Sequence, residues 1–165
     1  MYSEFTPRSI KTFNGVTLTG CTRIEDTENC QSYIAFLDEE YNMETIKVVG
    51  NSDFTHGGSV ISKTPDNGFL LSGFIIPYET SPQWWEFYAI KLDSLGNVEW
   101  EQQYPEYLAN NYFRDAIVVE DGYMLLGTTT LDFNVWPYTA DILLMKIDWE
   151  GNKEWHRGYD YGTKE

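Results

Sequence analysis

Residues 88–100, YAIKLDSLGNVEW, return as LLMKIDWEGNKEW at 143–155 and, in a weaker form, as YIAFLDEEYNMET at 33–45. The aspartate in each copy lies 55 residues from the next. A short β-type run ends at that aspartate, and in the last two copies a Gly-Asn turn leads into a second run that carries a tryptophan. The sequence therefore predicts three copies of a pair of antiparallel strands.

A second motif precedes the first one in each unit. It is a hairpin signal, an Asn-Gly or Asp-Gly dipeptide, followed by an apolar run that ends in another glycine five residues later. A short β-branched run lies before each of these turns, near residues 9–12, 59–62 and 115–119. The turn dipeptides are Asn14-Gly15, Asn67-Gly68 and Asp121-Gly122, and the later glycines are Gly20, Gly73 and Gly127.

Together the motifs predict an all-β chain of tandem four-stranded antiparallel meanders. We expect one repeat domain over residues 1–165, with units at about 9–49, 59–104 and 114–161. A period near 50 residues with four strands favours blades of a β-propeller over a solenoid. In the first unit Tyr41 and Thr45 stand where the other units have glycine and tryptophan. Because tyrosine adopts positive φ angles poorly, we expect a different turn geometry there.

The units resemble a family of bacterial and archaeal β-propeller repeats that often occur in secreted or surface proteins. Its blades read approximately D-G-G-aromatic-apolar-apolar-x-G, followed by aromatic-apolar-apolar-K-apolar-D-x-x-G-N-apolar-x-W. Residues 66–73 with 88–100, and 121–127 with 143–155, follow this pattern, and the first unit follows it weakly. The resemblance implies a propeller fold and a secreted or cell-surface location, and it supplies no catalytic residues.

Three blades do not close a propeller ring, which usually needs about four to eight. We therefore expect either an open section of a longer repeat protein, joined to further blades, or half of a six-bladed ring made by two chains. Open sheet faces would favour self-association, because end repeats normally need polar caps.

The composition excludes several classes of partner. The 26 acidic and 11 basic residues give a net charge of −15, which repels nucleic acid and anionic membranes. No apolar run reaches the roughly 20 residues of a spanning helix, so we expect no membrane insertion. The first five residues have neither the basic nor the apolar region of a signal peptide. The acidic residues form no calcium-loop motif, and we expect no metal or cofactor.

Cys21 and Cys30 flank a polar, turn-like segment. They either form a cross-strand disulfide, which would indicate an oxidising compartment, or remain two thiols, since the hairpin register cannot be read from the sequence. No other cysteine or histidine lies near enough to complete a zinc site.

One face of the predicted disc is rich in aromatic and amide side chains. These lie in the segments between the second and third strands and between consecutive units. Flat rings beside amides suit sugars, which stack on them, and they suit extended peptides equally well; the alternative is that the rings pack between blades. The predicted ligand-binding residues are Phe54, His56, Trp84, Trp85, Tyr107, Asn110, Tyr112, Trp136 and Tyr138.

The case for catalysis is weaker than the case for binding. His56 and His156 belong to no triad or HExxH motif. Asp53, Glu106 and Asp115 lie near the expected strand ends, where a glycosidase would hold paired carboxylates. The sequence favours a noncatalytic binding or scaffold module for carbohydrate or peptide over a glycan-active hydrolase or a purely structural spacer.

Overall fold

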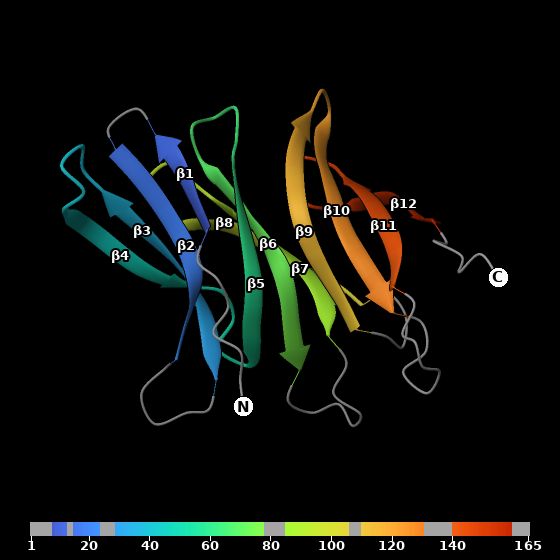
Figure 1. Cartoon of the computed structure of the whole chain (residues 1–165). Coiled ribbons are helices and arrows are strands. Elements are labelled where there is room, and N and C mark those ends of the chain that lie inside the picture. The colour runs from blue at the N-terminus through green and yellow to red at the C-terminus, as the bar shows by residue number, and fades with distance from the viewer. Residues whose placement is uncertain are drawn as a thin grey trace.

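The chain folds into three β-sheets, which stand side by side in Figure 1. This computed structural model describes residues 8–12, 15–23, 29–77, 85–105, 110–130 and 140–159. Within those ranges every regular secondary-structure element is a β-strand, and no helix is present. The prediction of an all-β chain is confirmed.

Each sheet is a meander in which four consecutive strands pair antiparallel in sequence order. The first sheet comprises β1 (Arg8–Thr12), β2 (Gly15–Arg23), β3 (Cys30–Leu37) and β4 (Met43–Val49). The second comprises β5 (Phe54–Lys63), β6 (Phe69–Pro77), β7 (Glu86–Leu92) and β8 (Val98–Tyr104). The third comprises β9 (Asn110–Val119), β10 (Gly122–Thr130), β11 (Ala140–Ile147) and β12 (Lys153–Tyr159). The repeated motifs thus predict the tandem meanders correctly.

The first strand of the second sheet and the first strand of the third sheet begin earlier than the sequence indicates. β5 starts at Phe54 and β9 at Asn110, about five residues before the expected positions. Each strand crosses an irregularity in its pairing, such as the register shift between Gly57 and Val60, and a bulge of this kind breaks the two-residue alternation. The prediction that the following residues lie in loops is therefore wrong: Phe54, His56, Asn110 and Tyr112.

Two apolar cores hold the sheets face to face. The middle sheet contributes to both, because alternate residues of a strand point to opposite faces. Leu71 and Ile90 face the first sheet, whereas Leu70 and Ala89 face the third. The rings of Phe87 and Phe113 stack across the second of these interfaces with centroids 4.2 Å apart. Each buried aliphatic or aromatic side chain contributes about 1.5–3 kcal/mol.

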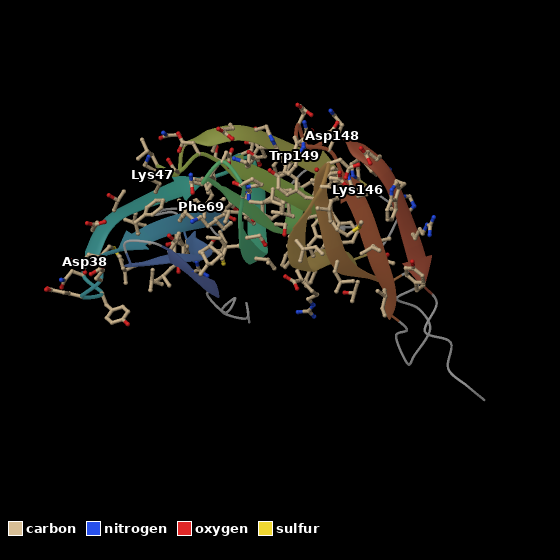
Figure 2. The ribbon with its side chains drawn as sticks, turned by 90° about the horizontal axis from the view of Figure 1, so that it is seen from above. Asp38, Lys47, Phe69, Lys146, Asp148 and Trp149 are labelled. Atoms are coloured by element: carbon tan, nitrogen blue, oxygen red, sulfur yellow. The ribbon has the colours of Figure 1, made fainter. Side chains whose placement is uncertain are left out.

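Viewed from above, the three sheets form an arch, with the first and third sheets at its ends (Figure 2). Lys47 of β4 donates a hydrogen bond of 2.7 Å to Asn97 and so joins the first sheet to a turn of the second. The middle sheet is covered on both faces. Each end sheet has one face covered by a neighbour within the described part of the chain.

A glycine with the same role lies at the start of the second strand in every sheet. A Cβ atom on this glycine would overlap the backbone carbonyl oxygen of the last residue in the third strand. In the first and third sheets the glycine also has a positive φ, of 131° and 146°, which L-residues rarely adopt. The pairs are Gly15 with Leu37, Gly68 with Leu92 and Gly122 with Ile147.

The turn between the third and fourth strands is built around one aspartate in all three sheets. In the middle sheet Asp93 Oδ1 accepts the backbone N–H groups of Leu95 and Asn97, both at 2.8 Å, and Asn97 Nδ2 donates to Asp93 Oδ2 at 2.7 Å. Asp38 and Asp148 make the same contacts in their turns. Hydrogen bonds from Asn97, first from its backbone, lower the pKa of Asp93.

The prediction that Tyr41 changes the geometry of its turn is wrong. Its φ is 65°, close to the 78° and 83° of Gly96 and Gly151 at the equivalent positions. The left-handed conformation costs a non-glycine residue about 1–2 kcal/mol, and the hydrogen bonds of the turn offset this cost. A Cβ on Gly151 would lie 2.8 Å from Trp100 of the neighbouring sheet, whereas no described sheet precedes Tyr41, which is 73% exposed.

Candidate functional site

Only part of the predicted ligand-binding set can be placed. Trp84, Tyr107, Trp136 and Tyr138 lie outside the described residues, as do the side chains of Asn110 and Tyr112. The ring of Trp85 stacks on Phe74 with centroids 4.4 Å apart, and Phe54 packs against the core between the first two sheets. An aromatic binding face at this end of the sheets stays a prediction.

His56 belongs to the interface between the first and second sheets. Its side chain has 0% exposure, and its Nε2 lies 2.9 Å from the carbonyl oxygen of Asn51. Its ring meets Tyr88 edge to face at 5.0 Å, and Gly50 approaches it so closely that a Cβ there would overlap the imidazole. Burial lowers the pKa of His56 despite the opposing effects of Asn51 and Glu101. It is a packed, neutral residue rather than a group on an open surface.

The two cysteines lie on one face of the hairpin but are not directly opposite. Cys21 pairs with Ser32 and Cys30 with Arg23, which places the cysteines two residues out of register. No disulfide joins them, and both are half-buried. Of the two alternatives, the structure has two thiols.

Two equivalent lysines are buried against carboxylates, one on the face of the middle sheet toward the third sheet and one on the outer face of the third sheet. Lys91 Nζ lies 2.7 Å from both Asp66 and Glu99. Lys146 makes the equivalent contacts with Asp121 and Glu154, at 3.0 and 3.3 Å. Burial opposes ionisation of Asp66, but hydrogen bonds from Lys91, Thr64 and Gly68 lower its pKa to about 2. Some acidic residues therefore support the fold instead of simply solvating the surface.

The described residues hold no cluster of three or more side chains that would ligate a metal ion. In the same part of the chain, no helix could cross a membrane.

A cleft of about 490 Å³ opens between the first and second sheets, at the end where the short turns lie. Phe36 and Phe69 form aromatic walls, with their rings edge to face at 5.7 Å. Thr17 also lines it, with 0% exposure, and its hydroxyl has no hydrogen-bond partner among the described residues. The complete lining is Thr17, Phe36, Leu37, Glu44, Thr45, Lys63, Asn67, Phe69, Ser94 and Leu95.

The equivalent position between the second and third sheets is filled by tryptophan. Trp100 corresponds to Thr45 in the repeat, and its Nε1 donates a 2.9 Å hydrogen bond to the carbonyl oxygen of Trp149. Tyr123 meets Trp100 at 6.4 Å and Trp149 at 5.1 Å, both edge to face. Trp149 itself corresponds to Ser94. Two tryptophans of one interface are thus replaced by two small hydroxyl side chains in the other. Phe36, the counterpart of Lys91, takes part of the place of Trp100 beside Phe69 and Gly96, and the cleft is the space that remains.

The sequence contained a signal for this cleft, since Thr45 breaks the tryptophan pattern. Within the sequence, that substitution indicates only that the first unit follows the repeat weakly. The cleft also depends on which residues of two different sheets face each other, and a single repeat does not show this.

Both end sheets expose apolar side chains on the faces turned away from the middle sheet. On the third sheet Trp155 and Tyr159 are 36% and 47% exposed, and Arg157 lies over the Trp155 ring at 5.3 Å. The register places the following residues on that face: Ile117, Met124, Leu126, Ile142, Leu144, Trp155 and Tyr159. On the first sheet Ile46 and Val48 pair with Ala35 and Tyr33 on the outer face, and both are exposed.

The chain matches no protein-family model, and no curated protein is significantly similar to it. The likeness to propeller repeats therefore rests on the motifs of the chain itself.

Proposed function

We propose that the chain is a section of a β-propeller-like array and works as a noncatalytic binding and scaffold module. Its end faces would pack against further sheets of the same repeat. The observation that carries this proposal is the pair Trp155 and Tyr159. They are exposed at the positions where Trp100 and Tyr104 pack against a neighbouring sheet.

The internal interface gives the chemistry of such a contact. Tyr104 donates a 2.8 Å hydrogen bond to the carbonyl oxygen of Gly151, and burial raises its pKa above the usual range. Phe87 and Ala89, also buried there, correspond to Ile142 and Leu144 of the third sheet. The end face of the third sheet therefore repeats the apolar character of a face that the chain itself buries.

A second copy of the chain is the simplest source of the missing sheets. The outer face of the third sheet would meet the outer face of the first sheet in the other copy. This is a head-to-tail contact, which closes into a ring when the rotation allows and otherwise extends. Two chains joined at both ends would give six sheets.

Light scattering coupled to gel filtration tests this proposal. We expect a discrete mass near twice 19.2 kDa. A double variant, Leu126→Glu with Ile142→Glu, would bury unpaired carboxylates in the contact and should raise the dissociation constant about tenfold or more. Val98→Glu is the matched control, because Val98 is exposed on the middle sheet. A wild-type monomer at every concentration, or equal effects of both variants, would count against association through these faces.

Carbohydrate or peptide binding at the opposite end of the sheets remains a prediction, because most of the aromatic residues on which it depends lie outside the described ranges.

A further inference from the structure

We propose that the cleft between the first and second sheets binds a neutral, planar aromatic group of about the size of an indole. This site lies at the end of the sheets that carries the short turns after the first and third strands. It does not depend on whether the end faces associate.

The size of the occupant follows from the equivalent interface. There the fourth strand supplies Trp100, whose ring lies against Tyr123 and closely approaches Gly151. In the cleft, Phe69 replaces Tyr123 and Gly96 replaces Gly151. Thr45 supplies no ring, and the ring that lies against Phe69 and Gly96 is that of Phe36. The backbone frame is the same, because both turns share their hydrogen bonds and their positive φ glycine. The place that stays open is that of Trp149, because its counterpart Ser94 lines the cleft and supplies no ring, and an external indole can take it.

The residues that line the cleft also favour a ligand that is apolar and uncharged. Phe36, Phe69 and Leu95 offer apolar and aromatic surface, on which a flat ring packs edge to face or offset. Glu44 and Lys63 contribute one charge of each sign to the lining, so the cleft has no net preference for an ion. The buried Thr17 hydroxyl lacks a partner among the described residues, and a ligand N–H group or a water could satisfy it.

Two sources could supply such a ring: a tryptophan side chain of a partner protein or a free aromatic molecule. The shared chemistry is tested with N-acetyltryptophanamide, and the sources are separated by comparing indole with a Trp-containing pentapeptide. For a group of this size we expect a dissociation constant of about 1 mM, and a tighter one for the peptide if neighbouring residues add contacts.

The full chain is titrated by NMR, with N-acetylalaninamide as the ligand control. The decisive variant is Thr45→Trp, which places in the first sheet the residue that the second sheet has. It should fill the cleft, raise the melting temperature and weaken ligand binding at least about tenfold. Glu120→Trp adds the same side chain at an exposed turn of the third sheet, outside the cleft and the end faces, and should leave binding unchanged.

Shifts confined to residues around Phe36 and Phe69, lost in Thr45→Trp and kept in Glu120→Trp, would support the site. Tighter binding of the peptide than of indole would identify a protein source, and equal binding would identify a small molecule. Absence of binding at about 10 mM, or binding that survives in Thr45→Trp, would overturn the proposal. If Thr45→Trp fails to fold, Ser94→Trp, which mimics Trp149, gives the same test from the other wall.

Discussion

At the scale of single residues, burial decides what His56 does. In the sequence it belongs to a polar Thr-His-Gly-Gly segment, which is typical of a loop and predicts a ligand-binding residue. In the fold that segment is the bulged start of β5, and the imidazole packs against Tyr88 and Gly50. Because the imidazole is buried, its protonation affects the free energy of unfolding instead of the binding of a ligand.

We expect the free energy of unfolding to fall as the pH drops below about 6.5, the ordinary pKa of histidine. Burial lowers the pKa of folded His56, so the unfolded chain binds more protons in this range, and acid favours unfolding. Stability from this residue is fully present above that pH. The loss approaches about 1.4 kcal/mol per pH unit for one histidine.

Urea unfolding between pH 7.5 and 5.5 measures this effect. His56→Gln should reduce the difference in the free energy of unfolding between pH 7.5 and pH 5.5, because glutamine does not titrate. His156→Gln removes the other histidine, which lies in β12, and is the matched control. Parallel curves for the wild type and His56→Gln would show that His56 does not govern the acid response.

At the scale of elements, the turn glycines fix how the second strand of each sheet leaves its hairpin. Gly122→Ala should destabilise the protein by about 2 kcal/mol or more, since the φ of 146° is strained for alanine and the new Cβ would overlap the Ile147 carbonyl oxygen. Gly158→Ala is the control, because a Cβ there meets nothing within 4 Å. Thermal or urea unfolding of both variants checks the difference, and similar stabilities would mean that the turn relaxes at little cost.

The same elements show how far the sequence predicts the fold. Turn glycines and the Asp-x-x-Gly-Asn motif act within one hairpin, so their spacing alone predicts the strands and the meanders. Longer strands were missed where bulges interrupt the alternation, as at Gly57 in β5. Tyr41 adopts a positive φ that tyrosine disfavours, because the hydrogen bonds between Asp38 and the turn hold the backbone in that geometry. Predicting the cleft would require knowing which residues of two sheets face each other, and the motifs of a single unit do not contain that information.

At the scale of the whole molecule, Tyr41 lies where a preceding sheet would pack. Gly151, its counterpart, fits closely against Trp100, so a tyrosine in that position would collide with the tryptophan of a neighbour. In a head-to-tail contact between two copies, Trp155 would approach Tyr41 in the same way. Tyr41 would therefore weaken such a contact, although its own turn keeps the geometry of the other two.

Tyr41→Gly separates these two effects. Glycine relieves the positive φ, which should stabilise the single chain by about 1 kcal/mol at any protein concentration. If copies associate through their end faces, it should also lower the dissociation constant of the dimer, because Trp155 gains the space that Trp100 has beside Gly151. Sedimentation over a range of concentrations measures the second effect, and melting at low concentration measures the first. Tyr41→Ala, which keeps a Cβ in the contact, is the control for the loss of the ring. A stabilised chain whose association is unchanged would mean that further sheets do not meet the first sheet at this turn, and that the apolar outer face of β4 meets a partner of another shape.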